Sequence, residues 1–201
     1  MQFPEFFEAA PRITVRDPLA AFLGAPPDGI IEYCYADVVK LAGHSCPTVA
    51  SAYLMTRAAL AALYPDALPA RGGIRVEVRK DRLEGVTGVV ANVVSFLTGA
   101  ADDTGFKGIG GRFDRRRLIA FDVDMPAQIR FTRVDTAQAV SVSARIDRVP
   151  ADPRLAGLMP RCLDGTATAE DVTLCQFLWQ GRVRTLLLEH ADDAQTIVVS
   201  R

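Results

Sequence analysis

The stretch VTGVVANVVSFLTG, residues 86–99, decides the fold, because it fits either a strand or a helix. Its many valines favour a strand, since β-branched side chains suit a pleated surface. The apolar positions, however, repeat with the spacing of one helical face: Val86, Val89, Val90, Val93, Val94 and Leu97. The helical spacing of the apolar residues is a stronger signal than the strand propensity of valine, so the sequence predicts a helix over residues 86–98.

A second helix is predicted just upstream, over residues 47–64. Arg57 is the only charged residue between Pro47 and Leu63, and alanine and leucine fill most positions. A helix that is apolar nearly all round is expected to be buried. Between the two helices, residues 73–79 alternate strictly between apolar and polar side chains, which is typical of a strand with one face inward.

The downstream half predicts three more strands and two helices. The strands cover residues 118–123, 129–134 and 139–149, with turns between them, and are expected to form an antiparallel meander. The helices cover residues 155–162 and 170–190. The fold class is therefore α+β: an α-β-α-β-β-β core with a small, mostly antiparallel sheet, plus C-terminal helices.

Three regions follow from this order of elements. Residues 1–30 are rich in proline and are expected to be an irregular lead-in with at most a short helix. Residues 31–150 form the α+β core, entered through a helix or an extended approach over 31–43. Residues 151–201 form a C-terminal helical extension.

Composition narrows the class of protein. The chain has 201 residues, 49% of them hydrophobic, and 23 basic against 24 acidic residues. This balance argues against a nucleic-acid partner, and no apolar run reaches the roughly 20 residues of a membrane span. The N-terminal residues do not resemble a signal peptide, and the four cysteines contain no CxxC pair. A reducing cytoplasm is the expected location.

The motif GHSCPT, residues 43–48, is the best candidate site. Pro47 suits the first turn of a helix, so Cys46 would lie beside the free N–H groups and the positive end of the helix dipole, which favour a thiolate. His44 can turn its imidazole toward the same point. Sulfur with imidazole suits zinc or another late transition metal. The alternative is that Cys46 is an inert buried cysteine. We favour that interpretation for Cys162 and Cys175, because they lie at apolar helix positions.

The stretch GHSCPTVASAYLMTRAAL, residues 43–60, resembles the Gly-His-x-Cys-Pro signature and following helix of the FmdE domain family, which takes its name from a component of formylmethanofuran dehydrogenase. In that family a helix ending in Thr-Gly is followed by a glycine-rich loop with a lysine and then by a strand. Here NVVSFLTG at 92–99, GFKG at 105–108 and LIAF at 118–121 take those places. The resemblance spans about residues 35–125.

The resemblance implies a core like the catalytic domain of glyceraldehyde-3-phosphate dehydrogenase and a bound metal, zinc, at His44 and Cys46. The family usually has glycine at the position of Thr48 and often has cysteine at the position of Ala100. This chain also has no cysteine-rich zinc ribbon. The third ligand is therefore open: the candidates are Asp102, Asp103 and Cys34. Two protein ligands leave free coordination positions, as in catalytic rather than structural zinc sites.

If the helices over 47–64 and 86–98 run antiparallel, the loop 99–112 would face the GHSCP loop. Asp102, Asp103 and Lys107 would then line the cavity above the metal, where the carboxylates could bind the metal or act as a general base and Lys107 could hold an anionic group of a small-molecule ligand. The alternative is a solvated loop whose charges only keep the protein soluble. The glycines at 108–111 are a weak phosphate-binding signal, because no P-loop sequence completes them.

Three functions remain open from the sequence. The first is a metal-binding accessory protein or metalloenzyme. The second is a protein whose Cys46 thiol reacts, and the third is a heme-binding module that uses Cys46-Pro47. A homodimer is expected, because symmetric dimers are the commonest oligomers and can complete an under-liganded site.

Overall fold

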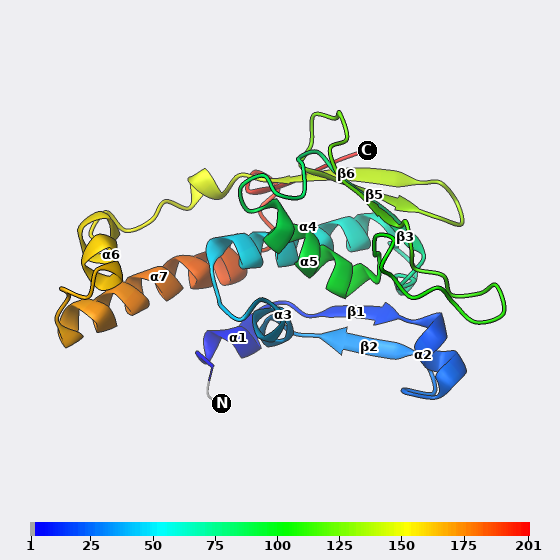
Figure 1. Ribbon diagram of the computed structural model, residues 1–201, viewed down its shortest axis with the longest axis horizontal. Coiled ribbons are helices and arrows are strands. Elements are labelled where there is room, and N and C mark those ends of the chain that lie inside the picture. The colour runs from blue at the N-terminus through cyan, green and yellow to red at the C-terminus, as the bar shows by residue number, and fades with distance from the viewer. Residues whose placement is uncertain (1–2) are drawn as a thin grey trace.

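The computed structural model describes residues 3–201 and has an α+β architecture (Figure 1). Its helices are α1 (Phe6–Ala9), α2 (Pro18–Leu23), α3 (Tyr35–Ala42), α4 (Pro47–Leu63), α5 (Thr87–Thr98), α6 (Leu155–Leu163) and α7 (Ala169–Glu189), with a 3-10 turn η1 (Ile146–Arg148). Its strands are β1 (Ile13–Arg16), β2 (Ile30–Tyr33), β3 (Ile74–Val78), β4 (Ile119–Ala120), β5 (Ile129–Arg133), β6 (Ala139–Ala144) and β7 (Ile197–Ser200).

The elements form three layers. A five-stranded sheet in the order β4-β3-β5-β6-β7 is the first layer, α4 and α5 are the second, and the antiparallel pair β1-β2 lies on the far side of the helices (Figure 1). In the larger sheet β3 and β4 are parallel, and every other neighbouring pair is antiparallel. The helices therefore have a sheet on either side.

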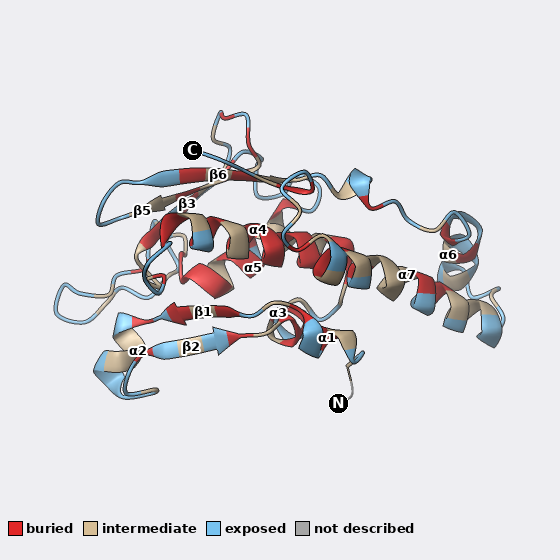
Figure 2. Ribbon diagram, turned by 180° about the vertical axis from the view of Figure 1, so that it is seen from behind, coloured by how far each residue is buried: buried red, intermediate tan, exposed pale blue. Residues whose placement is uncertain are grey.

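Helix α4 occupies the centre of the core. Most of its residues are buried, which agrees with its nearly continuous apolar sequence, and Figure 2 shows it mostly buried, with partly exposed positions in its C-terminal half. Tyr53, which is fully buried, donates a hydrogen bond from its hydroxyl to the carbonyl oxygen of Pro11 at 2.7 Å or of Tyr33 at 3.1 Å. Tyr53 thus links the central helix to the end of β2 or to the segment just before β1.

The helix predictions for the middle of the chain are confirmed. Residues 87–98 form a helix although valine is common there, because Ala91, Val93, Val94 and Leu97 share the buried face. The predicted face is wrong at its start, because Val86 precedes the helix and is exposed. The predicted helix over 47–64 and the predicted strand over 73–79 match α4 and β3 closely.

The predicted meander is wrong in its first strand. Only Ile119 and Ala120 of residues 118–123 are paired, and they run parallel to β3 at the sheet edge rather than antiparallel to β5. Residues 146–148 of the predicted strand 139–149 form the turn η1. The sheet gains instead an unpredicted strand, β7, which pairs with β6. An edge strand of two residues has too few positions for a period to show.

The predicted region boundaries also need correction. The lead-in 1–30, whose first two residues lie outside the described part of the chain, is not irregular, because it contains β1, the start of β2 and two short helices. The predicted extension 151–201 is not only helical, because it supplies β7. One hydrophobic core includes residues from Phe7 to Ile197, so the boundaries at 30 and 150 do not separate packing units.

Helix α7 joins the core to a small projecting helical pair. Its C-terminal half packs on α4, and its N-terminal half extends away from the sheets together with α6 (Figure 1). The pair has its own apolar cluster of Leu155, Leu158, Cys175 and Leu178. Within residues 3–201, no helix combines the length and the apolar character that crossing a bilayer requires.

The end of α5 generates a prediction about stability. Gly43 and Gly99 end α3 and α5 with left-handed backbone angles, φ 74° and 73°. A Cβ at Gly43 meets nothing within 4 Å, whereas one at Gly99 would lie 2.5 Å from Nη1 of Arg115. We expect Gly43→Ala to cost about 1–2 kcal/mol through backbone strain alone. Gly99→Ala should cost about 1 kcal/mol more, because the buried Arg115 must also move.

Urea unfolding of the two variants and the parent chain measures this difference. Equal free energies of unfolding for the two variants would contradict the close packing of Arg115 on Gly99.

Candidate thiol and imidazole site

The GHSCP loop connects α3 to α4 and places Cys46 at the start of the central helix. Pro47 occupies the first helical position, where its missing N–H costs nothing. Cys46 is the N-cap residue, and its Sγ accepts a hydrogen bond from the backbone N–H of Val49 at 3.4 Å. The residue is only 8% exposed. The prediction that this sulfur lies at a helix terminus is confirmed.

His44 is exposed, and its ring is oriented by two contacts. Nδ1 lies 2.9 Å from the carbonyl oxygen of Ala42, and Nε2 lies 3.3 Å from Sγ of Cys46. Because a carbonyl oxygen only accepts hydrogen bonds, Nδ1 is the donor to Ala42, and in the neutral ring Nε2 is then the nitrogen that presents a lone pair to the sulfur. This is the pattern of many metal-binding histidines, whose second nitrogen donates to a backbone carbonyl.

The separation of the two side chains fits a shared ion. Zinc bonds of about 2.3 Å to sulfur and 2.0–2.1 Å to nitrogen at a tetrahedral angle place the two ligand atoms about 3.5 Å apart. The distance between Sγ of Cys46 and Nε2 of His44 is 3.3 Å. Both ligands could therefore bind one ion with little movement of either side chain.

Ser45, between the two residues, is held by distant parts of the chain. Its hydroxyl lies 3.1 Å from the Tyr35 hydroxyl and donates to Oε1 of Gln180 at 3.0 Å. Its carbonyl oxygen accepts from Nε1 of Trp179 at 3.0 Å and from Nε2 of Gln180 at 3.3 Å. Burial raises the pKa of Tyr35, so its hydroxyl remains protonated. Helix α7 thus fixes the loop, a role for Trp179 and Gln180 that no local pattern predicted.

A cavity of about 570 Å³ adjoins the loop between α3 and α7. His44 and Ser45 contribute polar groups to its wall, while Val39, Met159 and Trp179 contribute apolar surface. A small molecule in this cavity would contact the imidazole directly.

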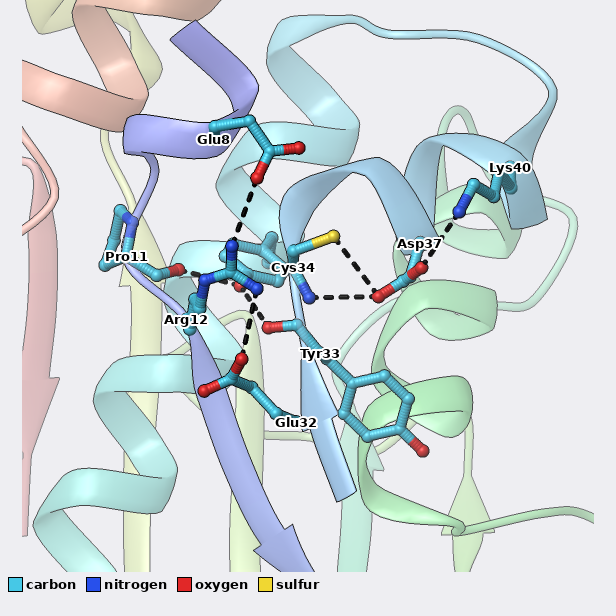
Figure 3. A network of polar contacts seen from close by, with 9 residues as sticks. Glu8, Pro11, Arg12, Glu32, Tyr33, Cys34, Asp37 and Lys40 are labelled. Atoms are coloured by element: carbon cyan, nitrogen blue, oxygen red, sulfur yellow. Dashed lines mark hydrogen bonds and ion pairs between the residues drawn. The ribbon is translucent and has the colours of Figure 1, made fainter. Parts of the chain in front are cut away.

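Cys34, one candidate for the third ligand, has a different local role. It is the N-cap residue of α3, where its Sγ lies 3.3 Å from Oδ2 of Asp37 and its backbone N–H donates to the same oxygen at 3.0 Å (Figure 3). Lys40 in turn pairs with Oδ1 of Asp37. Cys34 therefore belongs to a helix cap and not to the GHSCP loop.

The other predicted ligands also have separate partners. Asp102 forms an ion pair with Arg82 at 3.0 Å, and Asp103 forms one with Arg117 at 2.8 Å. Lys107 is exposed. No group of three or more His, Cys, Asp or Glu side chains within residues 3–201 is arranged to hold a metal ion. The structure thus brings His44 and Cys46 together, without Asp102 or Asp103.

The reason lies in the direction of the helices. A cavity is lined both by Thr48 at the start of α4 and by Thr87 at the start of α5, so these two ends are neighbours. At the other end, the N–H of Gly72, beyond the end of α4, donates to the carbonyl oxygen of Thr98 at 2.7 Å. The two helices run parallel, so the antiparallel arrangement that would bring the loop 99–112 to the GHSCP loop does not occur. The loop 99–112 leaves the far end of α5.

Structural roles explain three remaining candidates, which are Cys175, His190 and the glycine-rich segment 108–111. All four cysteines are free thiols, and Cys175 is buried in the cluster between α6 and α7, as expected for an inert residue. His190 caps α7, and its Nδ1 lies 3.0 Å from Oδ2 of Asp193. The glycines at 108–111 form a tight turn closed by Ile109 and Arg112.

The chain matches no model of a known protein family, and no curated protein matches it.

The contacts of Ser45 generate a prediction. Gln180→Ala removes two hydrogen bonds to Ser45 and should cost about 1–2 kcal/mol of stability. Loosening the loop should also speed the alkylation of Cys46 by a neutral thiol reagent, followed by peptide mass spectrometry. Gln176→Ala is the matched control, because Gln176 lines the same cavity from α7 but is exposed. Identical alkylation rates in both variants would show that Gln180 does not hold the loop.

Proposed function

We propose that the chain is a metal-binding protein whose site is formed by His44 and Cys46, with zinc as the preferred ion. The observation that carries the proposal is the 3.3 Å separation of Nε2 and Sγ, close to that of two ligands on one zinc ion. The contact from Nδ1 of His44 to the carbonyl of Ala42 supports it, because it leaves Nε2 free to bind. The similarity of GHSCP to the FmdE signature points the same way.

Two ligands leave at least two coordination positions for other molecules. Structural zinc sites use four protein ligands, whereas catalytic sites keep a position for water or substrate. The proposed centre is therefore one that receives a ligand from the adjoining cavity, or from a second copy of the chain in a homodimer. Such a centre suits an accessory protein or an enzyme that uses metal-bound water.

Zinc titration of the metal-free protein by calorimetry tests the proposal. We expect one zinc ion per chain. Cys46→Ser should weaken binding by more than the roughly 10–100-fold that loss of an outer-shell partner costs. Cys175→Ser is the matched control, because Cys175 is also a buried thiol but lies in the α6–α7 cluster.

Light scattering with and without zinc then shows whether a second chain supplies further ligands. Equal zinc affinity in the parent chain and in Cys46→Ser would refute the proposed site.

A second function is favoured by the hydrogen bonds to the sulfur. Sγ of Cys46 accepts from the Val49 N–H and faces Nε2 of His44, so it has both a helix terminus and a nearby base. In this alternative the metal-free thiol attacks an electrophile, and His44 takes up its proton.

The alternative predicts that His44→Ala slows alkylation of Cys46 by iodoacetamide in metal-free protein about tenfold or more, the lower range of general-base effects. Alkylation of Cys34, followed by mass spectrometry in the same sample, is the internal control. An unchanged rate at Cys46 would leave the thiol without assistance from His44 and reject this alternative.

A further inference from the structure

A buried cluster of three charged side chains lies at the far end of α5. Asp17 is 4% exposed, and its carboxylate accepts from Nη2 of Arg115 at 2.6 Å and from Nη1 of Arg71 at 2.9 Å. It also accepts from the backbone N–H groups of Leu19 and Ala20 at the start of α2. Burial would raise the pKa of Asp17, but the hydrogen bonds from the two arginines and from the Ala20 N–H, together with the charge of Arg115, lower the pKa overall. Asp17 is thus a carboxylate at neutral pH.

The two arginines differ in how far their donors are used. Arg71 directs Nε and Nη2 to the carbonyl oxygen of Phe96, at 3.2 and 2.8 Å, in addition to its bond to Asp17. Arg115 is 8% exposed, and its bond from Nη2 to Asp17 is the only side-chain hydrogen bond it makes within the described residues. Its buried Nε has no partner there. Burying a guanidinium whose N–H donors lack acceptors costs free energy, and a ligand that accepts hydrogen bonds from them would offset that cost.

The backbone holds Arg115 in this position. Its N–H donates to the carbonyl oxygen of Phe106, and its own carbonyl oxygen accepts from the N–H of Ala101. The guanidinium packs over Gly99 so closely that a Cβ there would lie 2.5 Å from Nη1. The donor is therefore preorganised by the fold and is not a mobile surface arginine.

A cavity of about 590 Å³ opens over the cluster. Asp17, Arg71 and Arg115 are the titratable side chains of its wall, which gives the wall one excess positive charge. Leu23, Leu41 and Phe106 line it with exposed apolar surface. Asn92 and Ser95 of α5 also line it, and their side chains can donate further hydrogen bonds.

We propose that this cavity binds a small monoanionic carboxylate with a short apolar chain, and that the Nη1 group of Arg115 is its principal anchor. A carboxylate matches both the single excess charge and the planar guanidinium donors. The apolar wall accommodates the chain. A doubly charged phosphate monoester would leave one negative charge uncompensated. The site is independent of His44 and Cys46.

Calorimetric titration of the full chain with hexanoate, hexan-1-ol and inorganic phosphate tests the proposal. We expect saturable binding of hexanoate and binding at least about tenfold weaker for the alcohol and for phosphate. Arg115→Gln should weaken hexanoate binding about tenfold or more, because it removes the charge-assisted donor. Thermal unfolding of this variant verifies that it folds.

A second variant keeps the test decisive if Arg115→Gln fails to fold. Leu41 is 45% exposed in the cavity wall, so Leu41→Asp should preserve the fold and weaken hexanoate binding severalfold by charge repulsion. Leu163→Asp is the matched control, because Leu163 is 81% exposed on α6, outside this cavity. Absence of hexanoate binding, equal binding of the alcohol, tighter binding of phosphate, or equal affinity in both aspartate variants would overturn the proposal.

Discussion

The burial of α4 on nearly every side is the constraint on which the rest of the structure depends. A helix of 17 residues with almost no polar surface cannot face water, so it must be covered all round. The larger sheet covers one side, α3, α5 and α7 cover others, and Tyr53 reaches the β1-β2 pair. The N-terminal strands and the end of α7 are thus required parts of the core, although they lie far from α4 in the chain.

The sequence predicts those elements whose cause is local. Helix α5 can be recognised because its period continues over three turns, and α4 because its composition is apolar throughout. Strands β1, β2 and β7 have four residues each, and β4 has two, so no period could identify them. Their pairing depends on segments distant in the chain, such as β6 for β7. The parallel direction of α4 and α5 is likewise a product of tertiary packing, and a pattern within one helix does not contain it.

The same division holds for the candidate site. His44 and Cys46 are two residues apart beside a proline, so their proximity can be predicted from spacing and helix-start chemistry alone. The contacts that hold the loop cannot be predicted in this way, because Trp179 and Gln180 are separated from Ser45 by about two thirds of the chain. A ligand role for Asp102 and Asp103 requires the two helices to run antiparallel. With the helices parallel, each aspartate pairs with a nearby arginine instead.

The contacts of the loop after α5 therefore follow from its position at the C-terminal end of that helix. Its sequence predicts carboxylates for a metal and Lys107 for an anion. In the fold its continuation brings Arg115, rather than Lys107, into a buried position against Asp17 and Gly99. A positive charge held there with unused donors suits an anion better than a metal cation, because like charges repel strongly where water is excluded. The metal site proposed at the start of α4 and the anion site proposed beyond the end of α5 thus use different side chains. The parallel helices keep the two sets apart.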